Sequence, residues 1–219
     1  MSTPKPTRRH WLLAGLHLAA WLPLANLARD VLVRGWPINP IQDWTFGTGL
    51  PALIFLVLTL AITPLLTLTG WSALTPLRRW LGLYAFFYAL LHVSIFVVLD
   101  YGLDLALMWD TVLEKRYILA GLGAFVILLP LALTSTRGWQ KRLGREWKVL
   151  HRGAYVAAGL AVLHFAWLVK ADLTEPLLYG AAVAGLLVLR LPAVRRRLAG
   201  LRHSRAAGAG RPGPASDRA

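Results

Sequence analysis

Long apolar runs alternate with short polar or charged segments along most of this chain. The runs contain almost no Asp, Glu, Lys or Arg, and the charged residues gather between them. A helix needs about 20 mostly apolar residues to cross the hydrocarbon core of a bilayer. The pattern therefore predicts six transmembrane helices, at about 10–28, 48–68, 80–99, 117–136, 151–169 and 176–194. The sixth includes Arg190, whose long side chain can extend to the membrane surface.

The predicted fold class is all-α, a polytopic membrane protein built as a bundle of six transmembrane helices. Because the connections are short, neighbouring helices are expected to be adjacent and antiparallel. The bundle forms one domain over residues 10–197, after a short N-terminal segment, 1–9. Residues 198–219 are rich in Gly, Ala, Arg and Pro, which predicts a disordered basic tail. No internal repeat is evident in the sequence.

Prolines and loop-forming residues mark the connections. Residues 29–44 include Pro37 and Pro40 and are expected to be irregular. Residues 100–116 form the other sizeable connection on the same side. Pro64 lies late in the second predicted span, where it is expected to kink or end the helix.

The charge pattern predicts the orientation in the membrane. The chain has 24 basic and 10 acidic residues and a formal net charge of +14. With a cytoplasmic N-terminus and six spans, nineteen of the 24 basic residues are cytoplasmic and eight of the ten acids lie outside. This distribution follows the positive-inside rule and predicts that both termini are cytoplasmic. The basic charge is thus explained by topology and lipid contact, not by nucleic acid.

The first span could imitate a secretory signal peptide, since a basic lead precedes it. Its apolar run is long, however, and the sequence "ANLA" before Arg29 lacks the small-residue pattern of a cleavage site. We therefore expect an uncleaved membrane anchor.

Several kinds of chemistry are excluded by what the spans lack. The chain has no Cys, which excludes disulfides, iron–sulfur clusters and covalently attached haem. The spans have no Asp, Glu, Lys or Arg away from their ends, whereas ion-coupled transporters usually need such a group at depth. Histidine is the remaining candidate, and neutral imidazole is a good ligand for iron.

Two histidines are predicted to lie at the same depth. His92 follows Trp80 by twelve residues, which places it about 18 Å into its span at 1.5 Å per residue. His164 follows Gly153 by eleven residues, about 17 Å by the same rise. Both spans run outward from the cytoplasm, so the two imidazoles could bind one haem iron from opposite faces. His92 and His164 are the predicted axial ligands.

His151 is a third candidate, in the stretch "LHRGAYVAAGLAVLHF". It lies thirteen residues before His164, roughly 20 Å lower on an unbroken helix and roughly 140° away around the helix axis. Either the helix is distorted, for example near Gly159, or the two histidines serve different sides. His151 is thus a candidate for a second haem or for a site where electrons arrive. The alternative for each histidine is packing, which is the favoured interpretation for His17.

Five motifs in this order resemble the MsrQ family, also called YedZ, within the ferric-reductase-like transmembrane group. They are "LHLAAWLPLANL", "RRWLGLYAFFYALLH", "KRYILAG", "LALTSTRGWQKRLGREWKVLHRGAYVAAGLAVLHFAW" and "LLYGAAVAGLLVLR", and the resemblance covers about residues 12–197. The family's functional histidines fall on His92, His151 and His164, and His17 matches its first-span pattern.

The resemblance implies a b-type haem protein of the bacterial inner membrane. It further implies that the quinone pool supplies electrons, which pass to MsrP, a periplasmic molybdopterin enzyme that repairs methionine sulfoxide in proteins. A cytoplasmic flavin reductase and bound FMN are also associated with the family. Substrate reduction itself is expected in the partner, and acids such as Asp100, Asp104, Asp110 and Glu114 could help to orient it.

The chain departs from the two-haem members of the larger group, which carry two histidines on each of two helices. The inner position of the third span holds Arg78 or Arg79 instead. His151 could therefore ligate a second haem with another partner, or serve a quinone or flavin site. The competing function is a non-redox membrane transporter or structural subunit with packing histidines, which predicts a protein without a chromophore.

Overall fold

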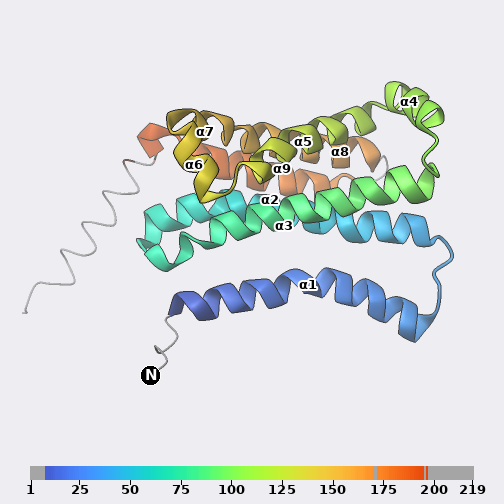
Figure 1. Ribbon diagram of the computed structural model, residues 1–219, viewed down its shortest axis with the longest axis horizontal. Helices are drawn as coiled ribbons and strands as arrows, with labels where there is room; N and C mark the ends of the chain where they lie inside the picture. Colours follow the sequence, from blue (N-terminus) through green and yellow to red (C-terminus); the bar gives the residue numbers. More distant parts are fainter. Residues whose placement is uncertain (1–7, 170–171, 195, 197–219) are drawn as a thin grey trace, which may run out of the picture.

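The computed structural model of the protein describes residues 8–169, 172–194 and 196, and all regular structure in them is helical. This confirms the all-α class for the described part of the chain. The long helices run side by side along one axis, and short helices connect them at the ends (Figure 1). In chain order the elements are α1 (Arg8–Arg34), α2 (Pro40–Thr69), η1 (Ser72–Leu74), α3 (Leu77–Ser94), η2 (Ile95–Asp100), α4 (Leu105–Glu114), α5 (Arg116–Leu133), α6 (Arg137–Leu143), α7 (Arg145–Leu150), α8 (Gly153–Leu168) and α9 (Thr174–Val188).

Five helical segments among the described residues are long and apolar enough to cross a membrane. They are Arg8–Arg34, Pro40–Thr69, Ser72–Asp100, Arg116–Leu133 and Arg145–Leu168. The sixth predicted span corresponds to α9, which has 15 residues and is shorter than a usual spanning helix. The count of six spans therefore stays a prediction. Residues 1–7 and the predicted tail with His203 lie outside the described residues.

The prediction of an irregular segment over residues 29–44 is wrong for most of its length. The first helix continues to Arg34 and the second begins at Pro40, so only residues 35–39 are non-helical. Asn39 caps the second helix by accepting a hydrogen bond from the Gln42 backbone at 3.2 Å, and Pro40 occupies the first turn. Pro at this position favours a helix start because its missing N–H would have no helical partner there. The predicted connection over residues 100–116 contains the ten-residue helix α4, which Asp104 caps.

Pro64 does not end the second helix, which continues to Thr69. A proline in a helix deprives the carbonyl four residues earlier of its N–H donor. That carbonyl belongs to Leu60, and the Nη2 atom of Arg190 donates to it at 2.6 Å. A side chain that follows α9 in the sequence thus replaces the missing backbone donor.

The first helix is attached to the rest of the bundle at its own proline. Pro23 lies inside α1, and the only buried residue of α1 is Ala20, three residues before this proline. The hydroxyl of Tyr88 on α3 donates to the Ala20 carbonyl at 2.6 Å, and the Tyr88 side chain is completely buried. This buried hydrogen bond ties α1 to α3 within one turn of Pro23.

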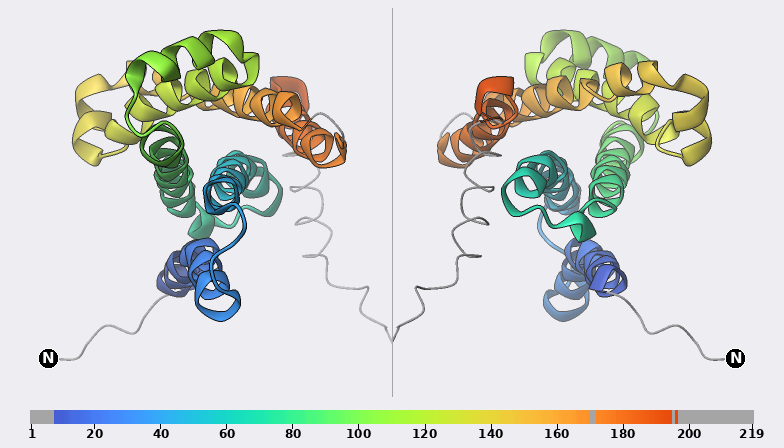
Figure 2. Two further views of the ribbon diagram at one scale, coloured as in Figure 1. Left: turned by 90° about the vertical axis from the view of Figure 1, so that its right-hand side faces the viewer. Right: turned by 90° about the vertical axis from the view of Figure 1, so that its left-hand side faces the viewer.

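The helices pack as two antiparallel pairs. In each pair, α2 with α3 and α5 with α8, the partners lie against each other along their length, and contacts between α2 and α8 and between α3 and α5 join the pairs. Figure 2 shows α2 and α3 beside each other, with α5, α8 and α9 along one side and α1 on the opposite side. Ala85, Ala157 and Ala158 are completely buried in the shared core. Small side chains allow membrane helices to approach closely.

The charged residues separate between the two ends of the bundle. We define the basic end as the end where α2 leads into α3, at the left of Figure 1, and the acidic end as the opposite one. Among the described residues, the basic end carries one acid, Glu146, beside Arg8, Arg9, Arg78, Arg79, Arg137, Lys141, Arg142, Arg145, Lys148, Arg152, Arg190 and Arg196. The acidic end carries eight acids, Asp30, Asp43, Asp100, Asp104, Asp110, Glu114, Asp172 and Glu175, against four described basic residues, Arg29, Arg34, Lys115 and Arg116.

Candidate functional site: two facing histidines in an apolar cavity

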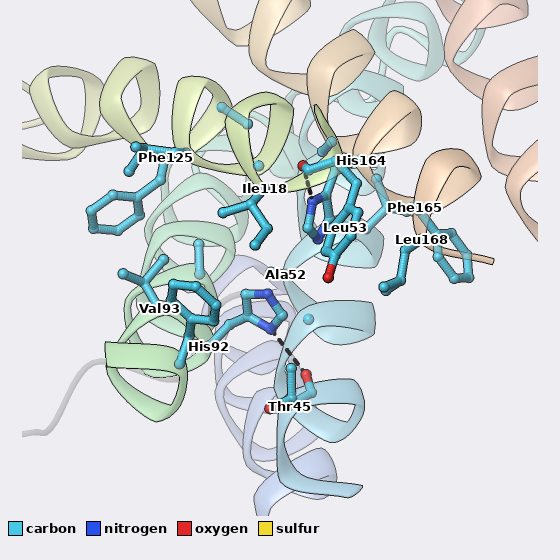
Figure 3. A pocket seen from close by; sticks show the side chains of 18 of the residues that line it. Thr45, Ala52, Leu53, His92, Val93, Ile118, Phe125, His164, Phe165 and Leu168 are labelled. Atoms are coloured by element: carbon cyan, nitrogen blue, oxygen red, sulfur yellow. Dashed lines mark hydrogen bonds between the residues drawn. The ribbon is translucent and has the colours of Figure 1, made fainter. Parts of the chain in front are cut away.

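A largely apolar cavity of about 330 Å³ lies between α2, α3, α5 and α8, toward the acidic end. Its volume falls within the usual range for small-molecule and cofactor sites. His92 and His164 both line it, together with aromatic side chains such as Phe125 and Phe165 (Figure 3). The π-helical segment Ile95–Asp100 extends α3 along the cavity, and Phe96, Val97 and Asp100 contribute to its lining.

His92 is held by the helix opposite it. Its Nδ1 atom lies 2.9 Å from the carbonyl oxygen of Thr45. A carbonyl can only accept, so Nδ1 must carry the proton and donate, which leaves the lone pair on Nε2. The ring lies against Gly49, where an added Cβ atom would be 2.9 Å from Nδ1. The side chain of any other residue at position 49 would therefore compete with the imidazole for space.

His164 has the same surroundings on the other helix pair. Its Nδ1 donates to the carbonyl oxygen of Tyr117 at 2.6 Å. An added Cβ atom on Gly121 would lie 2.6 Å from Nδ1 and 2.9 Å from the ring carbon Cε1. Its Nε2 lone pair is therefore also free to bind a metal.

The two arrangements are a structural repeat. Both hydrogen bonds join residues 47 positions apart. Each glycine precedes its histidine by 43 residues and follows the accepting carbonyl by one helical turn. At the offset of 72 residues that relates the two arrangements, several pairs are identical, among them Gly49 and Gly121, Ala89 and Ala161, and His92 and His164. Such common residue types do not stand out in an apolar sequence, but their equal spacing was the available signal.

The two imidazoles face each other across the cavity. Their ring centroids are 6.0 Å apart and their planes make an angle of 87°. In Figure 3 the ring nitrogens that are not bonded to carbonyls point into the space between the rings. Metal–nitrogen bonds to imidazole are about 2 Å long, so two rings on one metal from opposite sides have centroids about 6 Å apart. The separation suits two axial ligands of one ion.

The donor set suits a haem iron better than a bare ion. Within the described ranges, no group of three or more His, Cys, Asp or Glu side chains is placed to hold a metal. Two protein ligands are sufficient for haem, because the porphyrin supplies the other four. The apolar lining also suits a flat aromatic macrocycle. These residues therefore fit the cofactor that the sequence resemblance implies.

His151 is not part of this cavity. It lies in a turn between α7, which ends at Leu150, and α8, which begins at Gly153. The azimuth of roughly 140° assumed an unbroken helix from His151 to His164. That assumption is wrong, and the distortion lies at His151 itself and not near Gly159.

The His151 ring is nevertheless oriented as a ligand would be. It stacks on Trp147 with ring centroids 3.9 Å apart, and its Nδ1 donates to the Trp147 carbonyl at 3.1 Å. Its Nε2 is buried and has no hydrogen-bond partner among the residues that the structure describes. A buried nitrogen lone pair without a partner is unfavourable and indicates that a ligand belongs there. Trp147 is fixed in turn by donating from Nε1 to the Thr134 carbonyl at 2.9 Å.

His17 lies outside the cavity and has a protein partner. Its Nδ1 is 2.7 Å from the Tyr84 hydroxyl, and its ring meets Trp80 edge to face at 4.7 Å. This hydrogen bond is consistent with the packing interpretation of His17.

Comparison with known proteins identifies the family of this chain. Residues 48–162 match the family model described as "Ferric reductase like transmembrane component". A relative from Herminiimonas arsenicoxydans, named "Protein-methionine-sulfoxide reductase heme-binding subunit MsrQ", is 44% identical over 86% of this chain and 88% of its own length. A relative of the same name from Rhodospirillum rubrum is 46% identical over 84% of this chain and 89% of its own length.

A third relative with that name, from Xanthomonas oryzae pv. oryzae, is 43% identical over 78% of this chain and 82% of its own length. Similarity at this level extends well beyond the segment that the family model matches. The chain therefore belongs to the MsrQ family of ferric-reductase-like transmembrane proteins.

Proposed function

We propose that this chain is a haem b electron-transfer subunit of a protein-methionine-sulfoxide reductase system, and that His92 and His164 are the axial haem ligands. One observation carries the proposal. Two imidazoles with centroids 6.0 Å apart each donate Nδ1–H to a backbone carbonyl and present Nε2 to the same apolar cavity. The names of the relatives, which are heme-binding subunits, support it.

When bound, haem supplies a one-electron redox centre within the membrane. The residues around it determine its ligation. The carbonyls of Thr45 and Tyr117 fix the tautomer and orientation of the two rings and increase the basicity of their Nε2 atoms. Gly49 and Gly121 leave the space that the rings need. The apolar lining excludes water and so favours a bound hydrophobic cofactor.

The charge separation gives the orientation of the proposed electron path in the membrane. By the positive-inside rule, the basic end is cytoplasmic. In this proposal the chain crosses the bacterial inner membrane six times, with α9 as the sixth span. Electrons enter from the quinone pool, or from reduced FMN supplied by a cytoplasmic flavin reductase. They leave at the acidic end, toward the periplasm, for an MsrP-like molybdoenzyme.

The acidic end is suited to orient that partner. The cavity opens close to it, and Asp172 and Glu175 line a second hollow that shares Phe46, Leu50 and Phe165 with the main cavity. Hydrogen bonds from the side chain and backbone of Thr174 lower the pKa of Asp172 below its ordinary value, so this carboxylate is ionised at neutral pH. Fixed negative charge beside the site favours encounter with a basic surface on the partner.

His151 is the proposed second redox position. Its buried, unpartnered Nε2 supports a ligand role at the basic end. The inner position of α3 carries Arg78 and Arg79, so a second haem there would not have two histidine ligands in the usual way. His151 would ligate a second haem together with a different partner, or would contact the quinone or flavin that delivers electrons.

The absorption spectrum of the protein, purified from haem-sufficient cells, tests the proposal. We expect a Soret band that shifts on reduction with dithionite, and a haem-to-protein ratio of one or two. A colourless, haem-free preparation would contradict the proposal and favour a non-redox membrane protein.

A further inference from the structure

Arg190 follows α9 in the sequence and reaches back into the bundle. Besides the Leu60 carbonyl, which its Nη2 bonds at 2.6 Å, it donates from Nη1 to the Tyr155 hydroxyl at 2.5 Å. The guanidinium also lies over the Tyr155 ring, 4.9 Å from its centroid. These contacts come from α2 and α8, so the cation is fixed in position. They do not use its Nε donor, which is buried and has no partner.

A second guanidinium lies near the first. Arg78, near the start of α3, is exposed and interacts electrostatically with both Arg190 and Tyr155. Neither arginine is paired with a carboxylate, since the ion pairs among the described residues are those of Asp30 with Arg29 and Arg34. Two neighbouring cations at a membrane boundary repel each other unless an anion lies between them.

Thr63 adds a hydroxyl that points to the same conclusion. Five other threonines of α2 donate to a carbonyl one turn earlier in the helix: Thr45, Thr48, Thr59, Thr67 and Thr69. The Thr63 hydroxyl is buried and has no hydrogen-bond partner in the described ranges. Thr63 follows Leu60 by three residues, and residues at this spacing are neighbours on a helix surface. Thr63 and the Leu60 carbonyl that holds Arg190 therefore lie on the same side of α2.

We propose that Arg190, Arg78 and Thr63 form a phosphate-binding site at the basic end of the bundle. A guanidinium presents several donors in a fixed fork that matches phosphate oxygens, and a tetrahedral phosphate can accept from all three side chains at once. Basic pockets between membrane helices at the cytoplasmic surface are typical binding sites for anionic lipid headgroups. The phosphate belongs to such a headgroup or to a soluble phosphate. The site is separate from the cavity of His92 and His164, whereas Arg78 also interacts electrostatically with His151, the proposed second redox position.

The two sources can be separated in lipid nanodiscs. One series contains phosphatidylcholine with increasing phosphatidylglycerol, and the other contains phosphatidylcholine alone with added inorganic phosphate. The melting temperature and the phospholipid retained in native mass spectra report binding, while the Soret band reports the haem site independently. Stabilisation by phosphatidylglycerol alone identifies a lipid headgroup, and stabilisation by inorganic phosphate as well identifies a soluble phosphate. No stabilisation in either series would overturn the proposal, as would equal stabilisation by acetate.

Matched variants locate the site. Arg78→Gln is expected to weaken phosphate or lipid binding about 10-fold or more. Arg79→Gln, its neighbour, should not, because the Arg79 guanidinium lies over Trp80 instead, 5.7 Å from the ring centroid. Thr63→Val should weaken binding without destabilising the ligand-free protein, because the lost hydroxyl has no partner there. Arg190→Lys keeps the charge and a donor for Leu60 but lacks Nε. Equal losses in Arg78→Gln and Arg79→Gln would show a diffuse basic surface and overturn the site.

Discussion

The imidazole of His164 occupies the space in which Gly121 would carry a Cβ atom. The nearest ring atom, Nδ1, is 2.6 Å from that position, closer than non-bonded atoms can approach. His92 has the corresponding relationship with Gly49, at 2.9 Å. Each imidazole is therefore fixed between a glycine and the backbone carbonyl of the preceding helical turn, which orients it before any cofactor binds.

Replacing Gly121 with Ala is expected to displace the His164 ring and break its bond to Tyr117. Loss of such supporting interactions around a metal ligand typically weakens metal binding by about 10–100-fold. We expect Gly121→Ala to retain much less haem, and Gly49→Ala to shift the haem spectrum or retain less. The haem-to-protein ratio after purification measures both.

Gly159→Ala is the matched control for these glycine variants. It lies on the same helix as His164, and an added Cβ atom there meets no atom within 4 Å. Alanine is also the better helix former, by about 1 kcal/mol. This variant should keep the full haem content. If it loses haem as Gly121→Ala does, general helix disruption explains the loss, and Gly121 is not needed to leave space for the His164 ring.

The axial assignment predicts different effects for different histidines. His92→Ala and His164→Ala should each abolish most of the bound haem, since each removes one of two ligands to the iron. His17→Ala removes a hydrogen bond to Tyr84 outside the cavity and should keep the haem spectrum. A bis-histidine spectrum that persists in either of the first two variants would rule out the pairing of His92 with His164.

Substitution of His151 separates the two redox positions. His151→Ala should leave the haem between His92 and His164 intact, because His151 lines a different part of the bundle. We expect it to lose either a second haem or the ability to be reduced by a quinol or a reduced flavin. Haem stoichiometry and stopped-flow reduction distinguish these outcomes. A variant that keeps all haem and is reduced at the normal rate would leave His151 without a redox role.

Pro64 and Arg190 are predicted to be energetically coupled. Arg190→Ala leaves the Leu60 carbonyl without a donor, which costs about 1–3 kcal/mol for a buried group. In a Pro64→Ala background the new backbone N–H of residue 64 can bond that carbonyl, so Arg190→Ala should cost about 1 kcal/mol less there. Unfolding free energies of the four proteins in this double-mutant cycle measure the coupling. Additive effects would show that Arg190 does not replace the missing donor.

Tyr88 is expected to hold the first helix on the bundle. Tyr88→Phe removes the hydroxyl that donates to Ala20, at a cost of about 0.5–1.5 kcal/mol. Amide hydrogen exchange should therefore accelerate severalfold in α1 and change little elsewhere. Tyr179→Phe is a suitable control, because its hydroxyl makes no hydrogen bond within the described part of the chain. Equal acceleration in both variants would argue against a specific attachment through Tyr88.

The sequence determined the helical class, the order of the long apolar helices and the separation of charge between their ends. These properties depend on hydropathy and helical rise, which are local to each segment and can be counted along the chain. The same counting placed His92 and His164 at one level, and the structure brings their rings to 6.0 Å. The ends of helices were less predictable. Prolines in residues 29–44 indicate an irregular segment, yet Asn39 and Pro40 start a helix within it.

Tertiary structure alone decided what surrounds the histidines and the prolines. The carbonyls of Thr45 and Tyr117 lie 47 residues from the rings that they orient, and Arg190 lies 130 residues from the carbonyl that it contacts. In lipid, apolar side chains contribute little to the choice of helix partner, so close packing at glycine and alanine and the satisfaction of buried polar groups decide which helices meet. Those factors depend on atoms from several helices at once, and no single segment of the sequence contains them.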